Sequence, residues 1–292
     1  MKKDTQYALL GLLLTSAGAL LTLWLVFVSR NPDLFPKENP KSEWEQKEDE
    51  WTFGEYDENL FQTDTSQPGA DGKEEGLTQG NGEAGIVLEG EITEEIKEQN
   101  FYVTTISEAM KTRILQGISD TAQYEELLAQ QAYVHVLHYD FEGKVKTGEL
   151  LVYTGIAQSV LEIFQELYEA QYPIEKIRLV SEYGWDDAAS MQDNNTSAFN
   201  FRTIAGTNDW SKHALGMAVD INPLYNPYVY RQGEFVSVHP KEGTTYADRT
   251  TDCAYYIQAG DVCYHAFVSR GFTWGGDWEN PKDYQHFQVG KE

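Results

Sequence analysis

Cysteine and basic residues are both scarce in this sequence, and each scarcity argues against a kind of function. Only two cysteines occur among the 292 residues. The spacing of Cys253 and Cys263 matches no Cys-x-x-Cys pattern, which argues against a thiolate zinc site. Lysine and arginine number 22 against 47 acidic residues, giving a formal net charge of −25. Nucleic acid is therefore not expected as a partner, because binding a polyanion requires clustered basic side chains. Adhesion to anionic lipids or wall polymers is equally disfavoured.

Long apolar runs are also lacking, with one exception at the N-terminus. Residues 7–29 carry no charge and are dominated by Leu, Val, Ala and Phe. They are long enough to cross a hydrocarbon core of ~30 Å at ~1.5 Å per residue. Two lysines precede the run and Arg30 follows it, which favours a cytoplasmic N-terminus. We expect residues 1–30 to form a cytoplasmic tip and an uncleaved transmembrane anchor. A cleaved signal peptide is the competing interpretation, although residues 27–30 make a poor cleavage site.

Residues 31–104 lack any sustained apolar period. They are rich in Pro, Gly, Glu and Asp, a composition typical of segments that cannot bury enough surface to fold. We expect a disordered acidic linker, within which residues 92–99 could begin a short helix.

The remaining residues, 105–292, predict a single α+β domain with a central antiparallel sheet and flanking helices. Apolar spacing predicts a helix over 161–168, and strands are expected at 133–139 and 177–180. Residues 255–268 resemble a further helix packed against the core. If this domain lies outside the membrane, Cys253 and Cys263 could form a disulfide or stay free, and the sequence favours neither.

Two short segments offer ligands to a metal ion. Residues 211–220 contain His213 and Asp220, and residues 283–286 contain His286. Two imidazoles and one carboxylate are typical of a catalytic zinc site, which keeps three protein ligands and leaves the fourth position for water. Asp283 lies three residues before the last ligand and is the candidate general base.

Alternation of apolar residues supports this grouping. In the expected strand around Asp220, Met217, Val219 and Ile221 fall on one face and Asp220 on the other. The same alternation places His286 on the face of Gln288, opposite Phe287 and Val289.

The segment 197–202 adds a basic group by the same alternation. Phe199 and Phe201 fall on one face and Arg202 on the other. A guanidinium of this kind binds carboxylates or developing oxyanions.

Four segments together resemble the M15 family of zinc D-alanyl-D-alanine carboxypeptidases. They are Ser-x-His-x-x-Gly-x-Ala-x-Asp at 211–220, Ile-Asn-Pro-Leu-Tyr-Asn-Pro-Tyr-Val at 221–229, Trp-Gly-Gly-Asp-Trp at 274–278 and Asp-x-x-His-Phe at 283–287. The likeness extends over roughly residues 105–290. It is strongest to the VanY-like branch, which also holds L-alanyl-D-glutamate endopeptidases of phage and bacterial origin.

The resemblance implies a role for each candidate residue. His213, Asp220 and His286 would bind Zn²⁺, Asp283 would be the general base, and Arg202 would bind or stabilise the substrate. Asp rather than Glu as the base, and His286-Phe287 in place of Trp-His, are features of the endopeptidase-like branch. The substrate implied is the stem peptide of peptidoglycan. With the anchor expected at residues 1–30, we expect the domain on the extracellular side of a bacterial plasma membrane. The sequence does not indicate an oligomeric state.

Three functions stay open. The first is D-alanyl-D-alanine carboxypeptidase activity, and the second is L-alanyl-D-glutamate endopeptidase activity at the same site. The third is a non-catalytic zinc-containing binding module, as the resemblance of hedgehog signalling domains to this peptidase fold makes possible.

Other polar residues have structural explanations that are at least as good. His135, His138, His239 and His265 are expected to be packed or hydrogen-bonded histidines, although His239 could border the site. Ser211 could orient the metal site or cap a turn. Asp209 and Asp277 are candidates for holding the imidazoles.

Overall fold

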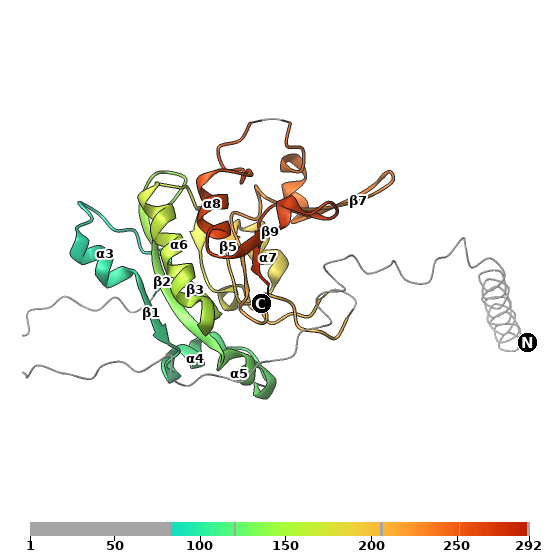
Figure 1. Cartoon of the computed structure of the whole chain (residues 1–292). Helices are drawn as coiled ribbons and strands as arrows, with labels where there is room; N and C mark the ends of the chain where they lie inside the picture. The colour runs from blue at the N-terminus through green and yellow to red at the C-terminus, as the bar shows by residue number, and fades with distance from the viewer. Residues whose placement is uncertain (1–82, 120, 205–206, 251, 291–292) are drawn as a thin grey trace, which may run out of the picture. The chain divides into compact units, whose positions relative to one another are not determined.

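A computed structural model describes residues 83–290 except 120, 205–206 and 251, which form one compact unit (Figure 1). Helices and antiparallel sheets are mixed, as expected for an α+β domain. The helices are α3 (Glu94–Asn100), α4 (Glu108–Ile114), α5 (Ala122–Leu128), α6 (Ala157–Glu169), α7 (Asp187–Gln192) and α8 (Val262–Val268). Short 3₁₀ helices are η3 (Thr154–Ile156), η4 (Val180–Tyr183), η5 (Lys241–Tyr246) and η6 (Gly275–Asp277).

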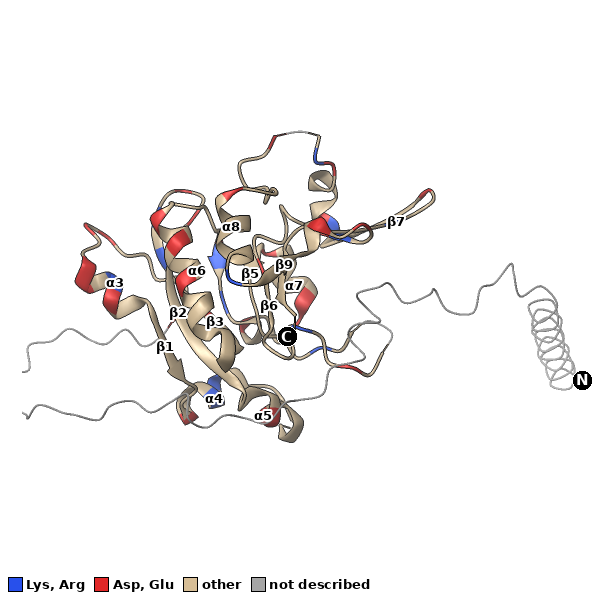
Figure 2. Ribbon diagram, viewed as in Figure 1, with Lys and Arg blue, Asp and Glu red and all other residues tan. Residues whose placement is uncertain are grey.

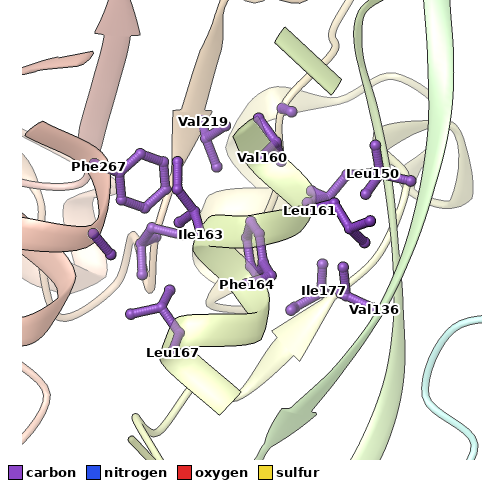
Figure 3. Close-up of a cluster of buried hydrophobic side chains, with 14 of the residues drawn as sticks. Val136, Leu150, Val160, Leu161, Ile163, Phe164, Leu167, Ile177, Val219 and Phe267 are labelled. Carbon is purple, nitrogen blue, oxygen red and sulfur yellow. The ribbon is translucent and has the colours of Figure 1, made fainter. Parts of the chain in front are cut away.

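The first half of the domain supplies a long hairpin and the central helix. Strands β2 (Gln131–Tyr139) and β3 (Val145–Tyr153) pair along nine residues, and β1 (Tyr102–Thr105) adds to the outer edge of β2. Helix α6 carries apolar residues at the three- and four-residue spacing of one helical face, and this face packs on β2 and on α8. Figure 3 shows Phe164 and Leu161 facing Val136 and Leu150, while Ile163 faces Phe267. One apolar core thus joins the hairpin to the C-terminal half.

The second half consists of short strands, and two small sheets carry the candidate site. One sheet has the order β6-β11-β9, with β6 (Ala218–Asp220), β11 (His286–Val289) and β9 (Phe272–Trp274). The other has the order β10-β7-β8, with β10 (Lys282–Asp283), β7 (Tyr228–Gln232) and β8 (Phe235–His239). The β7–β8 hairpin projects from the body of the domain (Figure 1). A two-stranded parallel pair joins β4 (Lys176–Ile177) to β5 (Asn195–Thr196).

Several elements differ from their predicted extents. The expected single central sheet is divided among three antiparallel sheets, because most C-terminal strands have only two to five residues. The strand expected at 177–180 contributes only its first residue to β4, and a 3₁₀ turn begins at Val180. The helix expected over 255–268 begins at Val262, because Asp261 caps it by accepting a hydrogen bond from the Tyr264 N–H.

The folded part also begins earlier than residue 105. Residues 83–104, which composition assigned to the linker, include α3, the short helix expected to begin within residues 92–99, and most of β1. Thr93 caps α3, and Val87 forms a bridge with Lys146 of β3. These short segments are stabilised by docking on the β2–β3 hairpin, so they show no apolar period of their own.

The predicted anchor over residues 1–30 and most of the predicted linker lie outside the described residues. Within the described residues, no helix has the length and apolar character needed to cross a bilayer. Cys253 and Cys263 are free thiols in the structure. Acidic side chains spread over α3, α6 and several loops (Figure 2), in keeping with the charge of the chain.

Candidate metal centre

His213, Asp220 and His286 meet at one point although 73 residues separate the first from the last. Asp220 and His286 are directly opposite each other in the antiparallel β6–β11 pair. His213 lies in the turn before β6, where Gly216 closes the turn with φ 68°. This backbone conformation suits glycine, and any side chain there would collide with Gln131 and with the backbone of Tyr153. The β2–β3 hairpin therefore sets the position of the His213 turn.

The three side chains are spaced as ligands of one ion. His213 Nε2 lies 3.1 Å from His286 Nδ1 and 3.2 Å from Asp220 Oδ2, and His286 Nδ1 lies 2.9 Å from Asp220 Oδ1. Ligand atoms about 2.0–2.1 Å from a tetrahedral zinc ion are separated from one another by about 3.3 Å. All three residues are at least 94% buried, so water screens their charges only weakly. The arrangement could hold a metal ion.

Hydrogen bonds on the far side of each ring fix the tautomers. His213 Nδ1 lies 2.6 Å from the carbonyl oxygen of Ala198, which can only accept, so Nδ1 carries the proton. His286 Nε2 donates to Gln288 Oε1 at 3.0 Å. The nitrogens that face each other are then both unprotonated in the neutral rings, and the third group is a carboxylate. Three acceptors at this distance repel one another unless a cation lies between them, which fits a metal.

In the metal-free centre, a proton on a facing imidazole nitrogen takes the place of that cation and is shared with the Asp220 carboxylate. Burial alone would raise the pKa of Asp220, but the charges and hydrogen bonds of His213 and His286 outweigh burial and hold that pKa far below its usual range. Burial lowers the pKa of His286, but the hydrogen bond and charge of Asp220 outweigh it and raise that pKa. The carboxylate thus stays charged and draws a cation to the centre.

Asp283 lies beside these ligands on β10. Burial, with the charge of Asp220, raises the pKa of Asp283 to about 6, although His286, His213 and a hydrogen bond from Gln285 act in the opposite direction. Its Oδ1 is covered and has no hydrogen-bond partner among the described residues. Gly275 allows this position, because a Cβ there would lie 2.6 Å from the Asp283 carbonyl oxygen. A carboxyl with a pKa near neutrality suits proton transfer.

Arg202 is held next to the His213 turn by its own backbone. The Ser211 N–H donates to the Arg202 carbonyl, and the Asn200 N–H donates to the His213 carbonyl. Asp187, at the start of α7, forms an ion pair with the side chain: its Oδ2 lies 3.2 Å from Arg202 Nε, without the geometry of a hydrogen bond, and its Oδ1 accepts from Asn200 Nδ2 at 2.8 Å. Helix α7 therefore orients the guanidinium.

The other polar candidates do not hold the ligand side chains. Asp209 and Asp277 are exposed, and the imidazoles are held by Ala198 and Gln288 instead. Ser211 Oγ accepts from the Ala214 N–H, so this serine caps the turn. His135 and His138 bond the carbonyls of Asn100 and Ile174, the structural role expected for them.

Three contributors were not predicted as parts of the site: the Ala198 carbonyl, Asp187 and Gln285. Gln285 is 3% exposed, and its Nε2 lies 3.7 Å from Met191 Sδ of α7. A backbone carbonyl carries no sequence signal, and no periodic pattern links α7 to the metal motifs. The strand alternation did place Gln288 on the face of His286, and this was the available signal for its role.

Comparison with known families agrees with the geometry. A family model described as D-alanyl-D-alanine carboxypeptidase, of the M15 peptidases, matches residues 205–289. The match includes His213, Asp220, Asp283 and His286, and it begins after Arg202. No curated protein and no solved structure matches the chain. Because the matched segment carries the candidate metal centre, it supports the M15 family and a peptidoglycan-related metallopeptidase, and members of this family depend on zinc.

Proposed function

We propose that this chain is a membrane-anchored zinc metallopeptidase that acts on peptidoglycan stem peptides as a D-alanyl-D-alanine carboxypeptidase of the VanY-like branch. The observation that carries the proposal is the convergence of His213 Nε2, His286 Nδ1 and the Asp220 carboxylate within 4.8 Å, inside the segment that matches the carboxypeptidase family.

The proposed chemistry divides among the metal and two side chains. A zinc ion held by His213, Asp220 and His286 would polarise the scissile carbonyl and lower the pKa of water. Asp283 takes the proton from the attacking water and passes it to the leaving amine. Its position beside the ligands and its raised pKa suit both steps, because one group must first accept and then donate.

Arg202 supports the choice of an exopeptidase. Asp187 contacts its Nε edge, and among the described residues no ion pair joins a terminal nitrogen of Arg202 to a carboxylate, which suits a guanidinium that binds a substrate carboxylate. A free C-terminal carboxylate is the group that a carboxypeptidase must recognise. The same guanidinium could bind a side-chain carboxylate of the stem, as an L-alanyl-D-glutamate endopeptidase would require.

The deciding experiment is digestion of a purified pentapeptide stem by the full-length protein loaded with zinc. We expect release of free D-alanine, measured by mass spectrometry, and no release by the His286→Ala protein. An intact D-alanyl end with a new N-terminal D-glutamyl fragment would overturn the carboxypeptidase assignment in favour of the endopeptidase. If the zinc-loaded protein cleaves no bond of the stem, the non-catalytic binding module becomes the favoured function.

The proposed location is the extracellular side of a bacterial plasma membrane, with residues 7–29 as the single span. Its support is the uncharged composition of that run and the acidic composition of the segment that follows. Protease added to intact, wall-stripped cells is expected to release the domain by cutting within residues 31–82, because exposed polar chain is cleaved preferentially. Protection in intact cells, with cleavage only after lysis, would place the domain inside.

A further inference from the structure

The β10-β7-β8 sheet extends the face that carries Asp283. In this antiparallel sheet Asp283 is opposite Tyr228, and Tyr228 is opposite His239. Side chains of directly opposed residues lie on the same face of a sheet, so Tyr228 and His239 continue the row that begins with the proposed base. Their rings lie 6.0 Å apart, which agrees with this placement.

The same face continues along the hairpin to its tip. Tyr230 is opposite Ser237, and Gln232 is opposite Phe235. The Tyr230 and Phe235 rings meet edge to face at 6.5 Å, and Phe235 is 60% exposed. We call the face formed by Tyr228, Tyr230, Gln232, Phe235, Ser237 and His239 the hairpin strip.

The chemistry of the hairpin strip differs from the rest of this acidic protein. Its six residues offer three aromatic rings, a hydroxyl, an amide and an imidazole, and none is a carboxylate. Figure 2 shows the acidic residue of the hairpin at its turn. The substrate polymer is itself rich in carboxylates, so a surface without acids avoids repelling it. Sugar rings have apolar C–H faces and polar edges, which exposed aromatic rings with neutral polar neighbours can bind.

The length of the hairpin strip determines which part of the substrate can lie at the tip of the hairpin. Four residues of β7 separate the Asp283 row from the Phe235 row, or about 13 Å at 3.3 Å per residue. Cleavage of the last bond of a pentapeptide leaves four residues between that bond and the sugar, which span about 13–14 Å when extended. A stem that runs along the strip from the Asp283 row would therefore bring its sugar end to the row of Phe235, whose ring contacts Tyr230.

We propose that the hairpin strip binds the glycan-linked substrate, with the stem peptide along Tyr228 and His239 and the N-acetylated sugar against Tyr230 and Phe235. This inference rests on the proposed function and extends it. It predicts that the protein prefers a stem attached to its disaccharide over the free pentapeptide.

The hairpin offers a matched pair of variants. Phe235 and Val236 are adjacent and both exposed, but Val236 is opposite Arg231 on the other face. In the full-length, zinc-loaded protein, Phe235→Ser is expected to lower kcat/KM for the disaccharide-linked pentapeptide five- to tenfold. The value for the free pentapeptide should not change. Val236→Ser should change neither value, and Phe235→Trp should keep the preference.

Each outcome has a defined meaning. Equal losses on both substrates in Phe235→Ser, equal effects of the two serine variants, or no effect of Phe235→Ser would overturn the glycan assignment while leaving the peptidase intact. If the unmodified protein cleaves neither substrate, the proposed function itself fails. Zinc content and the far-ultraviolet spectrum of each variant, both expected to be unchanged, confirm that the comparison concerns binding and not folding.

Discussion

At the scale of single residues, the Asp283 carboxyl affects both the proposed catalysis and the stability of the fold. Burial and the charge of Asp220 raise its pKa from near 4 to about 6 in the metal-free protein. A raised pKa means that the protonated carboxyl favours the folded state below pH 4 and that this contribution is lost as the pH rises through 6. Two pKa units correspond to up to about 3 kcal/mol. The ionised carboxylate of Asp283 therefore lowers the stability of the metal-free fold, and a bound cation would reduce this loss.

Asp283→Asn tests both roles of this carboxyl. We expect the variant to keep zinc and to lose kcat by 10²–10⁴-fold, roughly the contribution of a general base. The metal-free variant should also be more stable than the unmodified protein at pH 8, with the difference vanishing near pH 4. Turnover assays and urea unfolding at the two pH values measure these effects. Turnover close to that of the unmodified protein would contradict the assigned role.

Gln288 tests the tautomer of His286. The side chain accepts the Nε2 proton and so directs the Nδ1 lone pair to the other ligands. Gln288→Ala is expected to weaken zinc affinity about 10–100-fold, the usual effect of losing a partner behind a metal-bound imidazole. Competition with a chromogenic chelator measures the affinity. Gln158→Ala is the control, because that glutamine lies on exposed helix surface and bonds only Glu162 among the described residues. Unchanged affinity in Gln288→Ala would show that the ring is held by packing alone.

Asp187 tests the orientation of Arg202. Asp187→Asn removes the charge that holds the guanidinium, and both side chains are about one-third exposed, so the loss is moderate. We expect KM for the pentapeptide to rise roughly three- to tenfold with kcat and zinc content preserved. A pentapeptide with an amidated C-terminus should show no such change. The control is Asp186→Asn, which removes the neighbouring carboxylate that caps α7. Equal effects of the two variants would assign the result to helix α7 and not to Arg202.

At the scale of elements, short turns determine the positions of the proposed catalytic groups. Gly275, in η6, lies so close to β10 that a Cβ would contact Asp283 at its carbonyl and at its Cβ. Gly275→Ala must therefore displace the strand of the proposed base. Because a shift of about 1 Å can cost 10²-fold in rate, kcat should fall by about that factor with zinc retained. Gly290→Ala, which meets no atom within 4 Å, is the control. Full activity of Gly275→Ala would show that η6 moves freely.

The elements also show what the sequence could predict. Apolar spacing correctly predicted that His286 and Gln288 share a strand face, that Val219 and Phe287 are buried, and that a helix contains Phe164. These features depend on local periodicity, which a single sequence contains. Asp187 was not predicted, because its contact with Arg202 depends on how α7 packs. The start of the fold was placed too late for the same reason, since β1 is defined by its pairing with β2.

At the scale of the whole molecule, the core and the metal centre stabilise the domain in different ways. The α6 core joins both halves without any metal, so the metal-free domain is expected to fold. Zinc bound only to the folded state adds RT ln(1 + [Zn]/Kd), or about 4 kcal/mol at a thousandfold excess over Kd. For a domain of this size each kcal/mol raises Tm by roughly 2–4 °C. We therefore expect zinc to raise Tm by on the order of 10 °C in scanning calorimetry, and His286→Ala to abolish the increase while retaining a cooperative transition. Lack of any cooperative transition in the metal-free protein would instead make the ion a structural requirement of the fold.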